Sequence, residues 1–462
     1  MSVLLKLIDV AVYVGDRCLL APISLELTQG QPLTILGKTG SGKSLLAQAI
    51  MGLLPTALRV SGEIHVYGKR MTCRERQQLW GRELVMLPQE PWHSLDPIMK
   101  CVDQVTEVYQ CVKGQNKQDA LRSAEEALYQ VGLSHIGNKR PDELSGGMAQ
   151  RLAIAAATAG GATVILADEP TKGLDVSRRD GIVRLLQSRS RFGSLLTITH
   201  DVTVARQLGG ALLVMKDGHL VEKGETMVVL DSPQDDYTRA LIAAEPSVWT
   251  DIAPHSQKHD TDDILVVDQL KVARGGRTLF DGLSFSIKQG DVIGVVGDSG
   301  CGKSTLGDAL LHLVTPLSGR IARLNQAAKP HQWLKLYQDP PSAFSASVSL
   351  GQLLDDIIQL HDIDRTRVAP LMAKLSLPNG ILERNCLAVS GGELQRFSIL
   401  RALLLDPVFL FADEPTSRLD PITAKEVTTL LVSLASEAGC AVLLVSHDAA
   451  LIRKTCHQVI SL

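Results

Sequence analysis

One ordered series of short motifs occurs twice in this chain of 462 residues. Each copy holds a glycine loop, a glutamine, a Ser-Gly-Gly triplet, an Asp-Glu-Pro-Thr run and a His-Asp pair, beginning at Gly37, Gln89, Ser145, Asp168 and His200 in the first copy and at Gly297, Gln338, Ser390, Asp413 and His447 in the second. Five matches in one order indicate an internal repeat, which constrains the architecture more than any other feature.

The distance between the copies is not constant along the repeat. Lys303 follows Lys43 by 260 residues, whereas Gln338 follows Gln89 by 249. The second copy therefore lacks 11 residues between its lysine and its glutamine, and we expect a loop or an edge strand there. After the histidines, the first copy continues for about 45 residues, but the second stops soon after His447.

The repeat predicts two domains, residues 1–246 and 264–462, joined by a short polar linker, residues 247–263. Apolar runs bounded by turn signals predict strands at 32–36, 163–167, 194–199, 291–296, 408–412 and 441–446, and helices at 45–54 and 305–313. Strands that alternate with helices favour a mainly parallel sheet covered by helices, an α/β fold.

The two glycine loops match the phosphate-binding P-loop, Gly-x-x-x-x-Gly-Lys-Ser. Glycines let backbone N–H groups turn inward around phosphates, the lysine reaches the β- and γ-phosphates, and the following serine ligates Mg²⁺. The predicted ATP-binding residues are Gly37, Lys38, Thr39, Gly40, Ser41, Gly42, Lys43 and Ser44 in the first loop, and Gly297, Asp298, Ser299, Gly300, Cys301, Gly302, Lys303, Ser304 and Thr305 in the second.

An acidic pair ends one buried strand in each copy. Asp168 and Asp413 would meet the P-loop at the carboxyl edge of the sheet, where a Mg²⁺-anchoring aspartate belongs. The adjacent Glu169 and Glu414 can accept a proton from an attacking water. We therefore predict ATP as cofactor, Mg²⁺ held with help from Ser44 and Ser304, and ATP hydrolysis.

The segments Leu144-Ser-Gly-Gly-Met-Ala-Gln-Arg151 and Val389-Ser-Gly-Gly-Glu-Leu-Gln-Arg396 resemble the signature motif of ATP-binding-cassette (ABC) proteins. The resemblance covers nearly the whole chain. It implies two tandem P-loop NTPase domains, each a mainly parallel sheet with an antiparallel β lobe and a helical signature subdomain. It also implies that ATP contacts Ser145, Gly146, Gly147, Ser390, Gly391 and Gly392.

The same resemblance assigns further roles by position. Gln89 and Gln338 would touch Mg²⁺ or water, and His200 and His447 would contact the γ-phosphate and position the attack. Tyr13 would stack on adenine in the first site; the same spacing before Lys303 falls on Ala273, followed by Arg274. Asp175 and Asp420 resemble the aspartates of the D-loop. In the first copy, Lys172 stands where the family usually has a serine.

Family members pair head to tail, with ATP held between one P-loop and the opposing signature. Here both halves belong to one chain, so the resemblance implies an intramolecular pair. Lys43 would face Ser390–Gly392, and Lys303 would face Ser145–Gly147.

Two segments resemble the peptide/nickel importer branch of the family. The glutamines open Gln89-Glu-Pro-Trp-His-Ser-Leu-Asp-Pro97 and Gln338-Asp-Pro-Pro-Ser-Ala-Phe344, and the first copy ends in Tyr237-Thr-Arg-Ala-Leu. The branch's Cys-rich tail is missing, and the second copy has no Tyr-Thr-Arg segment. The branch usually uses two separate ATPase chains, so this chain resembles a fusion of the pair. We expect two docking segments, Glu90–Pro97 with Trp92 and Asp339–Phe344, to line two clefts that receive helices of the permeases.

These features favour an ATPase that energises an importer for peptides, nickel or related solutes. Its partners would be two transmembrane permeases and a substrate-binding protein. The longest apolar run, 152–167, is too short to span a bilayer, and the N-terminus lacks the pattern of a signal peptide. We therefore expect a soluble chain held peripherally at the cytoplasmic face of the plasma (inner) membrane.

Two other functions use tandem cassettes. Ribosome-acting members resemble this chain in motif order but carry a long, charged helical linker, unlike the span 247–263. DNA-damage-recognising members need zinc-binding CxxC pairs, which the eight cysteines do not form. A formal net charge of −3 gives no bulk attraction to nucleic acid.

Overall fold

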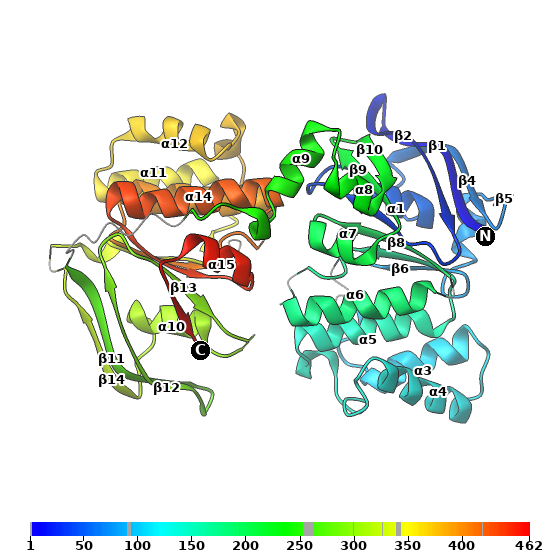
Figure 1. The fold of residues 1–462 in the computed structure, drawn as a ribbon, viewed down its shortest axis with the longest axis horizontal. Helices are drawn as coiled ribbons and strands as arrows, with labels where there is room; N and C mark the ends of the chain where they lie inside the picture. Colours follow the sequence, from blue (N-terminus) through cyan, green and yellow to red (C-terminus); the bar gives the residue numbers. More distant parts are fainter. Residues whose placement is uncertain are drawn as a thin grey trace. The chain divides into compact units, whose positions relative to one another are not determined.

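The structure is a computed structural model that describes residues 2–89, 94–172, 174, 176–191, 193–252, 262–298, 300–325, 327–338, 343–417 and 419–462, except for the side chains of 176 and 177. The chain divides into two compact units, Met1–Ile242 and Ala243–Leu462. We call them the first and the second cassette and describe each by itself (Figure 1).

The first cassette contains two sheets. An antiparallel sheet has the order β2-β1-β4-β5, formed by β1 (Val3–Val14), β2 (Arg17–Thr28), β4 (Leu58–Val66) and β5 (Lys69–Arg70). The other has the order β10-β9-β3-β8-β7-β6, formed by β3 (Leu33–Leu36), β6 (Leu84–Leu87), β7 (Val164–Asp168), β8 (Ser194–Thr199), β9 (Ala211–Lys216) and β10 (His219–Glu225). Its strands are parallel except β10, which pairs antiparallel with β9.

Nine α-helices accompany these sheets in the described part of the first cassette: α1 (Lys43–Met51), α2 (Cys73–Gln77), α3 (Cys101–Cys111), α4 (Lys117–Gln130), α5 (Gly146–Ala159), α6 (Val176–Ser190), α7 (Val202–Leu208), α8 (Thr226–Asp231) and α9 (Asp236–Ala243). Helix α1 contributes Leu46 and Ile50 to a core shared with both sheets. Helices α3, α4 and α5 share a second core with Val105, Leu128 and Leu152, and they lie together at the lower right of Figure 1. This group is the helical signature subdomain.

The second cassette repeats this plan with fewer strands. Its antiparallel sheet, β12-β11-β14, contains β11 (Asp263–Arg274), β12 (Arg277–Lys288) and β14 (Ser318–Arg323). Its parallel sheet, β15-β16-β17-β13-β18, contains β13 (Val292–Val296), β15 (Trp333–Leu336), β16 (Phe409–Asp413), β17 (Ala441–Val445) and β18 (Gln458–Ser461). The α-helices are α10 (Lys303–Leu310), α11 (Leu350–His361), α12 (Val368–Lys374), α13 (Gly391–Leu404), α14 (Pro421–Ala438) and α15 (Ala449–Thr455).

These elements confirm the predicted α/β fold with an antiparallel lobe and a helical subdomain in each cassette. The predicted strands lie where expected, within two residues at each end. Residues 243–252 belong to the second cassette: the Trp249 side chain is 4% exposed within its core, and Ile252 N–H donates to the Lys454 carbonyl over 2.8 Å. None of the described helices is long and apolar enough to cross a membrane.

The missing 11 residues explain one difference between the cassettes. Edge strand β5 and helix α2 lie between α1 and β6 in the first cassette, whereas the described residues between α10 and β15 hold only β14 and a short 3-10 turn. A single arginine stabilises the end of the P-loop helix in both. Arg76 of α2 donates to the carbonyls of Ala49 and Ile50, and Arg323 of β14 donates to the carbonyl of Leu310.

Candidate functional site

Each P-loop joins a buried strand to the N-terminus of a helix. Gly42 and Gly302 precede α1 and α10 with φ of 94° and 110°, a left-handed conformation that favours glycine. The lysine after each glycine begins the helix and turns back into the loop. Lys43 Nζ donates to the carbonyls of Gly37 and Lys38 over 2.6 and 2.7 Å, and Lys303 Nζ donates to Gly297 and Asp298 over 2.8 and 3.0 Å.

Both ammonium groups are therefore enclosed by their loops, and both lysines are less than 10% exposed. The other predicted loop residues lie around them, except Ser299, which is outside the described residues. This arrangement places a positive charge, loop N–H groups and a helix N-terminus together, which is a phosphate-binding arrangement.

The strand-terminal aspartates are buried beside the P-loop serines. Burial raises the pKa of Asp168 above its ordinary value, and a hydrogen bond from Ser44 partly offsets the shift. Burial likewise raises the pKa of Asp413, with Ser304 and Lys335 opposing the shift. Asp168 Oδ1 is buried without a hydrogen-bond partner. A buried, unpaired carboxylate oxygen next to a hydroxyl suits a small hard cation, so the first cassette's residues fit Mg²⁺.

A glutamate and a histidine contact each other in both cassettes. His200 Nδ1 lies 2.8 Å from Glu169 Oε1, and His447 Nε2 lies 2.5 Å from Glu414 Oε1. Glu169 and Glu414 follow β7 and β16 directly and have φ of 49° and 47°. Backbone strain of this kind is concentrated at functional sites.

The first of these pairs is an ion pair in a buried setting. Burial would raise the pKa of Glu169, but the charge and hydrogen bond of His200 outweigh it, so the pKa is lowered. Burial would lower the pKa of His200, but the charge and hydrogen bond of Glu169 outweigh it, so the pKa is raised. Each group therefore stabilises the charged form of the other.

The two predicted glutamines differ in their surroundings. Gln338 Nε2 donates to Glu414 Oε2 over 2.6 Å, so it contacts the acidic pair directly. Gln89 lies two residues beyond β6, and both glutamines are exposed. The two glutamines occupy equivalent positions in the repeat, so the sequence alone did not predict that Gln338 contacts Glu414.

The signature serines precede helices α5 and α13, as predicted, and Gly146, Gly147, Gly391 and Gly392 form the first helical turns. Ser390 Oγ accepts from Glu393 N–H, and the Glu393 carboxylate accepts from the backbone and hydroxyl of Ser390. Ser145 makes no side-chain cap, and Met148, at the position of Glu393, has no carboxylate to accept from Ser145. The D-loop residue Asp420 caps α14, whereas Asp175 is outside the described residues.

Tyr13 and Ala273 occupy the same hairpin position. Tyr13 of β1 faces Cys18 of β2, and Ala273 of β11 faces Thr278 of β12. The Arg59 guanidinium lies 4.7 Å from the centroid of the Tyr13 ring. The structure therefore provides an aromatic ring in the first cassette at the point where the second has only a methyl group.

One contact to the first P-loop was not predicted. The Lys38 N–H donates to the Tyr237 hydroxyl over 2.8 Å, and Tyr237 of α9 is 7% exposed. The Tyr-Thr-Arg segment was interpreted only as a mark of the importer branch. The contact joins residues 199 positions apart, and no motif in the sequence indicated it.

The expected permease-docking residues need one correction. Trp92 lies outside the described residues. Phe344 is only 8% exposed, packs 5.7 Å from the Phe397 ring and receives the Arg401 guanidinium on its face, so it is a core residue. Ile98, which follows the first docking segment, is 76% exposed.

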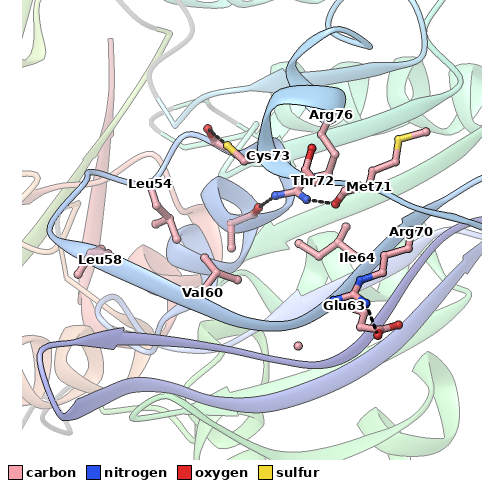
Figure 2. A pocket seen from close by; sticks show the side chains of 13 residues that line it. Leu54, Leu58, Val60, Glu63, Ile64, Arg70, Met71, Thr72, Cys73 and Arg76 are labelled. Atoms are coloured by element: carbon pink, nitrogen blue, oxygen red, sulfur yellow. Dashed lines mark hydrogen bonds and ion pairs between the residues drawn. The ribbon is translucent and has the colours of Figure 1, made fainter.

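A separate pocket of about 550 Å³ opens beside α1, β4 and α2 (Figure 2). Apolar side chains of Leu54, Leu58 and Val60 line one side of it, and the Arg70–Glu63 ion pair lies on the other. None of the predicted ATP or metal residues lines this pocket. It lies next to the segment that the second cassette lacks.

The geometry defines a chain with two P-loop ATPase sites. Comparison with known proteins identifies the family: the model of the ABC transporter family matches residues 20–172 and 280–417. The chain belongs to this family and is an ATPase with two cassettes. The predicted family, tandem arrangement and importer branch are confirmed.

Relatives match both cassettes. The chain is 34% identical to the peptidoglycan transport ATP-binding protein YejF of Agrobacterium fabrum, over 95% of this chain and 86% of the relative. It is 30% identical to the glutathione import ATP-binding protein GsiA of Salmonella typhi, over 95% and 80%. Among solved structures, an RNase-L inhibitor matches 98% of this chain and 87% of its own, with a TM-score of 0.68 and 20% identity, a likeness of fold alone.

Proposed function

We propose that this chain is the double ATP-hydrolysing subunit of an importer for peptides, nickel or related small solutes. The observation that carries the proposal is the match of both cassettes to relatives named for peptidoglycan transport and glutathione import. The intact Glu–His pairs support hydrolysis in both cassettes. Two permeases and a substrate-binding protein would complete the importer, with this chain at the cytoplasmic face of the inner membrane.

In this proposal Glu169 and Glu414 accept the proton of the attacking water, and His200 and His447 orient the γ-phosphate. Lys43 and Lys303 bind the β- and γ-phosphates. Mg²⁺ would be held in the first cassette by Ser44 and Asp168 with Gln89, and in the second by Ser304 and Asp413 with Gln338. The ion neutralises phosphate charge when bound. Head-to-tail pairing of the cassettes stays a prediction.

The test is co-purification followed by reconstitution. The chain should co-purify with two permeases encoded beside it, and in vesicles its ATPase should rise when a substrate-loaded binding protein is added. Glutathione and short peptides are the first substrates to try. Co-sedimentation with ribosomes and no permease association would overturn the proposal in favour of ribosomal action.

A further inference from the structure

A buried lysine lies beside the metal-anchoring aspartate of the second cassette. Lys335 of β15 has a side chain only 8% exposed, and its Nζ lies 2.7 Å from Asp308 Oδ1 and 3.6 Å from Asp413 Oδ2. Its ammonium also lies 5.2 Å and 5.5 Å from the ring centroids of Tyr337 and Phe411. The carboxylates and the rings hold a positive charge at this place.

The first cassette has no charged group at either position. The matched strands β15 and β6 place Lys335 where the first cassette has Met86. The matched helices α10 and α1 place Asp308 where the first cassette has Gln48. Met86 packs against the apolar core of the first cassette. The corresponding aspartate, Asp168, keeps one buried oxygen without a partner.

The two contacts of the Lys335 ammonium differ in length. Asp308, on the P-loop helix, takes the shorter ion pair with Lys335, whose ammonium also lies 3.6 Å from Asp413 Oδ2. The positive end of this pair therefore faces the carboxylate that a divalent cation would share. The ammonium and a divalent cation at Asp413 would repel each other strongly in this poorly solvated site, and the charge of Asp308 offsets part of that repulsion.

We infer that Lys335, held by Asp308, is a positioning residue that makes the second cassette bind its divalent cation more weakly than the first. The inference rests on the proposed role of Asp413 and Asp168 as metal anchors. It predicts two unequal metal sites in one chain: the first cassette is filled at low Mg²⁺, and the second requires more.

The chain offers a reciprocal exchange as the test. Lys335→Met with Asp308→Gln gives the second cassette the residues of the first, and Met86→Lys with Gln48→Asp does the reverse. Each exchange is combined with a P-loop variant of the other cassette, Lys43→Ala or Lys303→Ala. Only the exchanged cassette can then bind nucleotide. Mn²⁺ binding in the presence of a non-hydrolysable ATP analogue is followed by electron paramagnetic resonance, which reports the metal without any turnover.

The first exchange should lower the half-saturating Mn²⁺ concentration of the second cassette by about ten-fold, and the reverse exchange should raise that of the first by a similar factor. Nucleotide binding in a chelator should stay unchanged in both, which shows that the loops remain folded. Equal Mn²⁺ affinities of the two cassettes, or no response to either exchange, would overturn the inference.

Asp413→Asn separates this inference from the proposed function. If Asp413→Asn abolishes Mn²⁺ binding but the exchange of Lys335 and Asp308 has no effect, only the role of Lys335 fails. If Mn²⁺ still binds after Asp413→Asn, the metal assignment fails and the inference fails with it.

Discussion

The amide of Gln338 donates a hydrogen bond of 2.6 Å to the carboxylate of Glu414. The other oxygen of this carboxylate contacts His447. Both oxygens of the proposed base are therefore occupied by side chains of the same cassette. Each carboxylate oxygen can accept two hydrogen bonds, so a reacting water would share the Glu414 carboxylate with Gln338 and His447.

Replacing both glutamates by glutamine tests their role as bases. Glu169→Gln with Glu414→Gln should reduce ATP hydrolysis by about 10²–10⁴-fold, because general-base catalysis contributes on this scale. ATP binding should remain, since the amide keeps the shape of the side chain. Phosphate release and equilibrium binding are measured on the same preparation. Near wild-type hydrolysis in the double variant would show that the catalytic carboxylates lie elsewhere.

The ion pair of His200 and Glu169 predicts a pH-dependent stability. The pKa of His200 is raised, so its contribution is complete below the ordinary value of 6.5 and is lost as pH rises through the higher folded value. The pKa of Glu169 is lowered, so its contribution is complete above 4.5 and is lost as pH falls through the lower folded value. The pair therefore stabilises most between pH 4.5 and 6.5.

His200→Gln should cost about 1.5–3 kcal/mol in that range, the scale of a charge-assisted hydrogen bond, and less at pH 9. Denaturant unfolding at several pH values measures the difference. A cost that does not change between pH 5.5 and 9 would contradict the ion pair.

The hairpin position shared by Tyr13 and Ala273 predicts unequal nucleotide affinity. An aromatic ring stacked on a base contributes about 1–3 kcal/mol, so the first cassette should bind ATP at least about five-fold more tightly than the second. Binding is measured with Lys303→Ala and Lys43→Ala in turn. Ala273→Tyr should tighten the second site, and Tyr13→Ala is its matched control. Equal ATP affinities of the two cassettes would contradict the assignment of Tyr13 as the residue that stacks on adenine.

Coupling to permeases is best tested at an exposed residue. Ile98→Asp should lower uptake by about five-fold or more, the effect of losing about 1 kcal/mol at an interface, and leave basal ATPase activity unchanged. Phe344→Asp should behave differently, since a charge in the core costs several kcal/mol and lowers the melting temperature. Phe344→Leu copies Leu95, the matching residue of the first cassette, and should be tolerated. Wild-type uptake with Ile98→Asp would place docking elsewhere.

The sequence predicted the elements that depend on repeat and pattern. Buried strands such as β7 and β16 read as continuous apolar runs, and the P-loop spacing located the lysines. Helices α1 and α10 begin two residues earlier than expected, because polar residues after Gly42 and Gly302 form their first turns. Apolar periodicity cannot detect such a polar first turn.

Other features depend on three-dimensional contacts that no motif encodes. Phe344 stands in a run that resembles a surface turn, yet it folds onto α13. The pairing of Lys335 with Asp308 joins residues 27 positions apart on a strand and a helix. A position-by-position comparison of the two copies finds Lys335 where the first copy has Met86. That comparison identifies the position but does not reveal the ion pair with Asp308.

The hydrogen bond from Lys38 to Tyr237 joins residues 199 positions apart. A gene segment that encodes only the first P-loop, sheet and signature helix would leave this contact out. Isolated or shuffled versions of the first cassette must therefore extend through α9 to keep the loop as it is here. The second P-loop begins beside a different partner: the N–H of Leu462 donates to the carbonyl of Val296, directly before Gly297, over 3.0 Å. The two halves are therefore unequal as modules for protein engineering, although their motifs are the same.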